Sequence, residues 1–343
     1  TGDTNVMQGT LVVNHASALG TTTGNKTVVS SGATLNVNNK STAEPLELNG
    51  TGAGDAGALT GTGTSAAVSG SVTLVSDARV GVAAAGDVLT ISAVIGGAGG
   101  LTKVGSGTLV LSRANTYSGD TVISAGTLRV AAGNVIPDGT GKGNVAVDGT
   151  LDLNGWSEAV NGLSGSGLID NTAANAVSLG VGMNGQGGTF SGTIQETGGD
   201  LRLDKLGTGT LTLSGSNSYN GATNVNSGGT LVITHGNALG STSSGTTVSA
   251  NATLAVNVVR MAEPLTLSGV GVGGAGALQG IGTPHVAGPV TLAANSNVGV
   301  TAAADQLTIE GRITGNYALT KVGAGTLILT NGSNSYGPTT VSG

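Results

Sequence analysis

The feature that most constrains this chain is a glycine-rich segment that occurs three times. It runs from Leu101 to Val130, returns from Leu201 to Ile233, and returns again from Leu319 to the last residue. The first residues, TGDTNVMQGTLVV, match the tail of a further copy, so we expect the chain to start and stop inside a repeat. Regular recurrence of this kind predicts a stacked architecture in which each unit buries its apolar face against its neighbour.

A coarser duplication contains these copies. GTLVVNHASALG, starting at Gly9, matches GTLVITHGNALG, starting at Gly229. The motif lysines lie at positions 103, 205 and 321, and their spacing gives the length of one unit. Glutamates occupy one shared landmark of the three units, at Glu44, Glu158 and Glu263. We predict one continuous solenoid over 1–343, with repeat units at approximately 1–130, 131–233 and 234–343.

Short apolar alternations separated by Gly, Asn or Ser recur every 8 to 12 residues, which is typical of an all-β chain. Interior Gly and β-branched Val and Thr argue against helices. Because charged side chains should face water, we expect Glu47, Arg129, Asp152 and Arg202 to point outward and their aliphatic neighbours inward.

The composition favours a narrow core. Aromatic residues make up 2% of the chain, so a core of Val, Leu, Ile and Ala suits stacked coils better than a sandwich. Inward sets of Leu109 with Leu111, then Val122, then Leu128 with Val130 fit three short strands per coil of about 20 to 25 residues. We therefore predict an all-β, right-handed parallel β-helix (β-solenoid) of roughly 15 coils; propeller blades are the alternative.

Composition also excludes several classes. The net charge of −6 is spread thinly, and no basic stripe exists for nucleic acid. The sequence contains no stretch of 18 or more apolar residues, so we predict no membrane span in these residues. The absence of Cys excludes disulfides and thiolate metal sites.

The repeated string resembles a known family. Leu-Thr-Lys-Val-Gly-x-Gly-Thr-Leu, followed by Asn-Thr/Ser-Tyr, Thr-x-Val and Gly-Thr-Leu, resembles the autotransporter-associated β-strand repeat, also called the passenger-associated transport repeat. The matching positions are Lys103, Gly105, Gly107, Thr108, Leu109, Asn115, Tyr117, Gly126, Thr127 and Leu128; Lys205, Gly207, Gly209, Thr210, Leu211, Asn217, Tyr219, Gly229, Thr230 and Leu231; and Lys321, Gly323, Gly325, Thr326, Leu327, Asn334 and Tyr336. The resemblance implies a right-handed β-helix in a type V secreted or very large surface protein of a Gram-negative bacterium, located extracellularly. It also implies roles in adhesion, biofilm or secretion itself.

Histidines and serines give weak catalytic signals. His15 and His235 occupy equivalent positions, and the third unit has Asn134 near that place, which indicates polar turn residues. His285 has no metal-ligand spacing to another His. The sequence NGLSGSG around Ser164 matches a nucleophile elbow in letters only.

Carboxylates are the alternative route to catalysis, because many β-helix proteins cleave polysaccharides. Asp148 with Asp152, and Asp200 with Asp204, are the closest pairs. Four residues apart on one strand, the members of a pair would lie about 13 Å apart on the same outer face, too far for glycosidase chemistry. A calcium loop at Asp55 has Gly274 as its counterpart, which argues against a repeated site. We therefore predict no catalytic residues, no cofactor and no metal.

The repeated tyrosines Tyr117, Tyr219 and Tyr336 have two interpretations: a surface ladder for carbohydrate, or turn anchors whose rings cover a coil corner, which the wide spacing favours. The lysines either lie on a solvated turn or neutralise a backbone carbonyl. Trp156 is the only tryptophan, and it is either an exposed contact or a gap-filler.

The sequence thus predicts a structural or adhesive extracellular stalk or fibre segment that supports adhesion or a biofilm matrix. The expected partners are further copies of itself or neighbouring repeats, and host or matrix glycans. Alternatives are a polysaccharide-active enzyme and a stacking repeat that promotes secretion.

Overall fold

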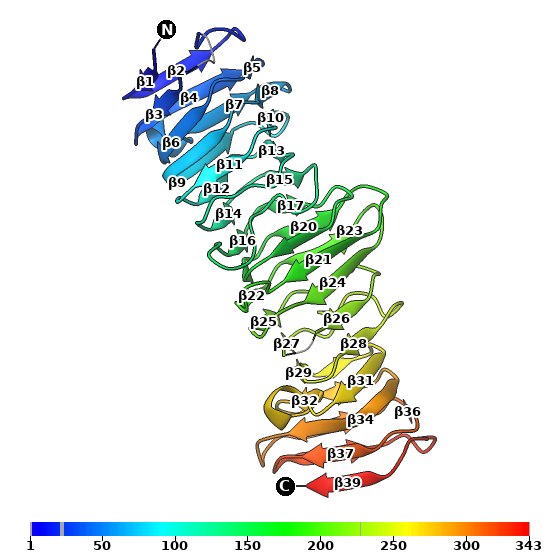
Figure 1. The fold of residues 1–343 in the computed structure, drawn as a ribbon. Coiled ribbons are helices and arrows are strands. Elements are labelled where there is room, and N and C mark those ends of the chain that lie inside the picture. Colours follow the sequence, from blue (N-terminus) through cyan, green and yellow to red (C-terminus); the bar gives the residue numbers. More distant parts are fainter. Residues whose placement is uncertain (1, 21–23, 227, 343) are drawn as a thin grey trace. The chain divides into compact units, whose positions relative to one another are not determined.

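The computed structural model describes residues 2–20, 24–226 and 228–342 (Figure 1). The chain forms two compact units, which we describe separately. Unit 1 comprises Thr1–Val160 with Gly167–Ala173, and unit 2 comprises Asn161–Ser166 with Ala174–Gly343. Both are parallel β-solenoids, and the described residues contain about 15 turns and about 2% helix.

In the described part of unit 1, the strands form three stacks. The first contains β1 (Thr4–Val6), β3 (Thr27–Val29), β6 (Leu46–Gly50), β9 (Val72–Val82) and β11 (Ile95–Gly97). The second contains β2 (Gly9–Val13), β4 (Ala33–Asn38), β7 (Leu59–Thr62), β9 again, β12 (Leu101–Val104), β14 (Thr121–Ile123) and β16 (Val145–Val147). The third contains β5 (Ser41–Thr42), β8 (Ala66–Val68), β10 (Val88–Ile91), β13 (Thr108–Leu111), β15 (Thr127–Val130), β17 (Thr150–Asp152) and β20 (Leu168–Asn171). β18 (Glu158–Val160) follows β17.

The described part of unit 2 repeats this plan. One stack contains β21 (Val177–Val181), β24 (Leu201–Lys205), β26 (Thr223–Val225), β28 (Thr246–Val248), β31 (Leu265–Gly269), β34 (Val290–Val300) and β36 (Ile313–Thr314). A second contains β22 (Gly188–Phe190), β25 (Thr210–Leu213), β27 (Thr230–Ile233), β29 (Thr253–Val256), β32 (Leu278–Gly280), β34 again, β37 (Leu319–Val322) and β39 (Thr339–Ser342). A third contains β30 (Arg260–Met261), β33 (His285–Val286), β35 (Gln306–Ile309) and β38 (Thr326–Leu329). β19 (Leu163–Ser164) and β23 (Thr193–Glu196) complete the strands, and the short 3₁₀ turns η1 (Ala53–Asp55) and η2 (Val272–Gly274) occupy equivalent loops.

The ladder registers give the length of a coil. Thr27 pairs with Leu46, and Leu46 pairs with Val72. The difference between two paired residue numbers is the number of residues in one coil. In unit 2, Thr223 pairs with Thr246 in the same way. These steps bracket the predicted coil length. Coils such as β3–β4–β5 have the predicted three short strands, whereas cassette coils such as β14–β15 have two. The predicted fold class, an all-β parallel solenoid, is confirmed.

Alternation of side chains builds the core. Leu109 and Leu111 are buried and lie in register with Leu128 and Val130 of the next coil. The phase predicted for β14 is wrong: Thr121 and Ile123 are buried, whereas Val122 faces outward. Thr121 can point inward because its hydroxyl has a hydrogen-bond partner inside the coil, as described below.

Of the four charged residues predicted to point outward, Glu47, Arg129 and Arg202 are accessible to solvent and Asp152 is not. Arg129 is 43% exposed and Arg202 is 52% exposed, but the Asp152 side chain is only 2% exposed. Its carboxylate accepts hydrogen bonds from Arg129 Nε at 2.7 Å, from the Asn154 amide at 2.9 Å and from the Thr172 hydroxyl at 2.8 Å. These donors replace water, so a carboxylate on this face is buried without being unpaired.

Glycine at the coil corners allows coils to approach closely. Gly126 has φ of 62°, and a Cβ atom there would clash with the carbonyl oxygen of Gly105 in the preceding coil. A side chain at this position would force the two coils apart.

Candidate functional surfaces and the repeated cassette

We call the segments 101–130, 201–233 and 319–342 the cassette. Its lysines are buried: Lys103, Lys205 and Lys321 are 1%, 0% and 6% exposed. Lys103 shares the inward phase of Leu101 on β12, so the alternation of the strand directs the ammonium group into the coil. Of the two interpretations from sequence, the solvated turn is wrong and the carbonyl partner is confirmed.

The lysine ammonium groups bind the glycine-rich turn that follows them. Lys103 Nζ donates to the carbonyl oxygens of Val104 at 3.0 Å, Gly105 at 2.7 Å and Ala125 at 3.1 Å. Ala125 belongs to the next coil, so one ammonium joins two coils. Burial lowers the pKa of both Lys103 and Lys205 to about 8 because the charged form loses its hydration. The carbonyl oxygens supply acceptors in place of water.

Two of the cassette asparagines, Asn115 and Asn217, each link three consecutive coils. The Asn115 side chain accepts a hydrogen bond from the Ile95 amide at 2.8 Å and donates to the Val135 carbonyl at 2.7 Å. Asn217 bonds in the same way to Ile194 and Ala238, at 2.8 and 2.6 Å. An amide side chain carries both a donor and an acceptor, so a single Asn can join the coil before it to the coil after it. We call this arrangement the asparagine clamp.

The cassette tyrosines are core residues. Tyr117 and Tyr219 are 0% exposed, and their hydroxyls lie 2.6 and 2.7 Å from the hydroxyls of Thr121 and Thr223. Burial raises the pKa of both phenols above its ordinary value. The hypothesis of a surface ladder for carbohydrate is therefore wrong for these two, and the interpretation as internal anchors of the coil corner is confirmed. Tyr336 is half-buried and accepts a hydrogen bond from Thr339.

The landmark glutamates are buried as well, which the sequence did not predict. Glu158 accepts hydrogen bonds from the backbone amides of Val135 at 3.1 Å and Ile136 at 2.8 Å. Desolvation raises the pKa of Glu158 to about 8 and that of Glu263 to about 7, against the opposing effect of hydrogen bonds to each carboxylate. Neither carboxylate oxygen of Glu44 has a hydrogen-bond partner among the described residues. The three glutamates thus lie inside the coils rather than on a solvated face.

The other candidate residues lie apart from one another. His15 and His235 are exposed turn residues whose Nδ1 atoms accept backbone amides two residues on, at 3.2 and 3.1 Å, as predicted. Asp148 follows β16 and Asp152 ends β17, and these strands belong to different stacks. The prediction that this pair shares one strand is therefore wrong, because the chain turns at Gly149.

His285 lies in a cluster that the sequence did not indicate. Its Nδ1 lies 2.8 Å from Glu310 Oε1, and Arg260 is 2.7 Å from Glu310 Oε2, so three side chains from neighbouring coils meet on the surface.

Trp156 is 47% exposed, which favours the exposed contact over the gap-filler. Within the described residues, no group of three His, Cys, Asp or Glu is placed to hold a metal ion. In the same part of the chain, no helix is long and apolar enough to cross a membrane.

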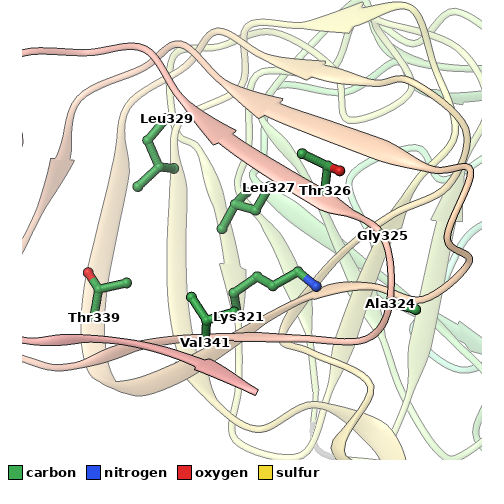
Figure 2. Close-up of a pocket in the computed structure, with 8 residues that line it drawn as sticks. All are labelled: Lys321, Ala324, Gly325, Thr326, Leu327, Leu329, Thr339 and Val341. Carbon is green, nitrogen blue, oxygen red and sulfur yellow. The ribbon is translucent and has the colours of Figure 1, made fainter. Parts of the chain in front are cut away.

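Among the described residues, only β39 follows the coil formed by β37 and β38, and the core of that coil is partly uncovered. A pocket of about 360 Å³ opens between these strands, and Figure 2 shows its lining side chains. Leu327 and Leu329 are half-buried, whereas the equivalent Leu109 and Leu111 are fully covered by the next coil. Val341 is 71% exposed, and all four residues of β39 are exposed.

Comparisons with known proteins agree with the sequence resemblance. The family described as Passenger-associated-transport-repeat matches residues 101–130, 203–233 and 319–343. The chain is 33% identical over 267 residues to a protein named Adhesin BmaC autotransporter, from Brucella suis biovar 1 (strain 1330). This alignment covers 75% of the chain but only 7% of that relative's length. No solved structure matches the chain.

Proposed function

Because this chain is a repeat region of the autotransporter passenger type, we propose that it is a non-catalytic structural segment of a protein displayed on the surface of a Gram-negative bacterium. One observation carries the proposal: the Lys, Asn and Tyr side chains that the first two cassettes share are buried inside the coils. Lys103, Asn115 and Tyr117 are all buried, and the first two bond to backbone groups of the next coil. A segment whose repeated residues are internal serves to hold a solenoid together.

We propose adhesion as the role of the displayed protein. The relative is named an adhesin, and a rigid solenoid suits the presentation of binding surfaces away from the cell. Specific recognition then belongs to the spacers between cassettes, where the units differ in sequence.

A second candidate role is the promotion of secretion. Coils that stack outside the cell make outward movement favourable, and the asparagine clamps would oppose the return of a stacked coil. The clamp favours this role because it joins the coil of Asn115, and likewise that of Asn217, to the coil before it and the coil after it.

Deletion of residues 131–233 from the full-length protein separates the two roles. The deletion joins Val130 to Thr234, which keeps the order of strands because β15 and β27 are equivalent cassette strands. Surface display is measured by antibody labelling, and attachment to a host-cell layer or an abiotic surface is counted. Normal display with reduced attachment supports adhesion, reduced display supports secretion, and no change in either contradicts both.

We further propose that the uncovered coil at β39 stacks on another coil of the same kind, from neighbouring repeats or from a second copy. Its uncovered leucines are equivalent to Leu109 and Leu111, which β15 covers in the first cassette, and its exposed strand β39 is equivalent to β14, which β16 covers. Such stacking would support fibre formation or a biofilm matrix.

A further inference from the structure

A groove in unit 1 is not explained by the stacking of coils. It has a volume of about 330 Å³ and lies where the loop containing Asp55 projects over the outer face of β4, β7, β9 and β12. Its floor includes Gly61 and Gly81, and a Cβ atom on Gly81 would clash with the carbonyl oxygen of Ala56 in that loop. The volume is at the low end of the range of about 300–1,000 Å³ for small-molecule sites.

Polar side chains line one side of this groove. Asn36 donates to the Thr60 hydroxyl at 2.9 Å and accepts from the Thr62 hydroxyl at 3.2 Å. Asp55 contributes an exposed carboxylate at the rim and pairs with Arg79 at 3.4 Å. Small residues, among them Ala56, Ala83 and Val104, supply the apolar part of the lining.

Unit 2 contains the same coils without this polar lining. At the positions equivalent to Asn36, Asp55 and Thr62 it has Ala255, Gly274 and Ile281. The apolar floor is retained, since Gly81 and Val104 correspond to Gly299 and Val322. The fold therefore does not need the polar side chains of unit 1.

The equivalent surface of unit 2 is also occupied by its own side chain. Gln279 replaces Thr60, and its amide donates to the Thr301 hydroxyl at 2.9 Å. Gln279 lies in register with Gly299, the counterpart of Gly81, so its longer side chain replaces that of Thr60 beside the same glycine. Unit 1 is open and polar where unit 2 is covered.

From this difference we infer that the unit 1 groove is a binding site for a neutral saccharide. Its amide, hydroxyl and carboxylate groups together donate and accept hydrogen bonds, which matches a ligand whose hydroxyls do both. Among the described residues that line the groove none is Lys, Arg or His, which disfavours an anionic ligand. The small apolar residues can contact the C–H face of a sugar ring. The inference deepens the proposed role in adhesion and rests on it for its biological meaning.

The test uses the methyl glycosides of glucose, galactose, mannose and N-acetylglucosamine, with methyl glucuronide as the charged control. Binding to the whole chain is measured by saturation-transfer NMR and by shifts of the Thr62 and Gly81 amides. We expect at least one neutral glycoside to bind with shifts at these amides, and the glucuronide to bind more weakly. No binding of any neutral glycoside, shifts elsewhere only, or preference for the glucuronide would overturn the inference.

The control variants place the residues of unit 2 at the equivalent positions of unit 1. The triple change Asn36→Ala, Asp55→Gly and Thr62→Ile introduces residues that the same coils already carry, so the fold is expected to be retained. Loss of these hydrogen bonds should weaken glycoside binding at least about tenfold, which corresponds to about 1.4 kcal/mol. The reciprocal change Ala255→Asn, Gly274→Asp, Gln279→Thr and Ile281→Thr should create a second site. Equal binding by the wild type and the triple variant would overturn the inference.

The failure of this inference can be told apart from failure of the proposed function. If the full-length triple variant is displayed and attaches normally while its glycoside binding is lost, the groove binds a saccharide but adhesion does not depend on it. If glycosides do not bind although display and attachment are normal, the groove inference alone fails.

Discussion

Substitution of Asn115 by alanine should uncouple three coils at one point. The change removes the acceptor for the Ile95 amide and the donor to the Val135 carbonyl, and Asn115 is only 7% exposed, so water cannot readily replace it. Leaving a buried polar group unsatisfied costs about 1–3 kcal/mol, so two such groups should destabilise this region by about 2–6 kcal/mol.

The direct assay is amide hydrogen exchange of the Ile95 N–H, followed by NMR. A loss of about 1.4 kcal/mol of local stability is already a factor of ten, so exchange at Ile95 should accelerate at least about tenfold. Amides of distant coils, such as Val29, should keep their wild-type rates.

Asn334 provides the matched control. Its side-chain oxygen accepts a hydrogen bond from the Ile313 amide at 2.8 Å, but Asn334 is half-buried. Asn334→Ala should therefore lower local stability by about 1 kcal/mol, and it should accelerate hydrogen exchange at Ile313 less than Asn115→Ala does at Ile95. If Asn115→Ala leaves Ile95 protected, or affects exchange no more than Asn334→Ala does, the asparagine is not a clamp and our account of the cassette is wrong.

Three further predictions concern titration and assembly. The ammonium groups of Lys103 and Lys205 should titrate near pH 8 by NMR. In the unfolded chain these groups keep their protons to about pH 10.4. The folded chain therefore gains stability from them as the pH rises from about 8 to 10. Glu158, with its pKa raised to about 8, stays protonated in the folded chain where the unfolded chain has lost the proton, so its contribution to stability falls from about pH 4.5 to 8. Glu158→Gln should flatten that part of a chemical-denaturation pH profile, and an unchanged slope would contradict the assignment. Val341→Lys should reduce concentration-dependent association in sedimentation velocity by placing a charge on the uncovered coil; a monomeric wild type would contradict end-to-end stacking.

Repetition and alternation are sufficient to predict the fold. The recurrence of the cassette with an in-phase Leu-x-Leu strand specifies parallel stacking, because equivalent residues of successive coils must lie in register. Charge is a weaker guide, since the rule that charged residues face water competes with local hydrogen bonding. At Lys103 the alternation with Leu101 already indicates an inward position, and the carbonyl oxygens of the glycine turn make that burial tolerable.

The partners of buried polar groups could not be predicted, because most of them come from other coils. Asp152 is buried because Arg129 lies in register with it one coil earlier, and Val122 faces outward because Thr121 has the Tyr117 hydroxyl as an internal partner. The saccharide groove has a similar origin. The contrast between Asn36 and Ala255 is visible in the sequence, but the bond between Gln279 and Thr301 that covers the equivalent surface of unit 2 requires coordinates.

The asparagine clamp has a mechanical consequence. A solenoid pulled from one end would peel strand by strand, because each ladder opens a few hydrogen bonds at a time. At Asn115 the load is shared between the coil of Ile95 and the coil of Val135, so the next coil cannot detach before this link breaks. A chain with clamps at Asn115 and Asn217 should therefore unravel under force in bursts, and the length released between the two clamps should equal the spacing between the first two cassettes.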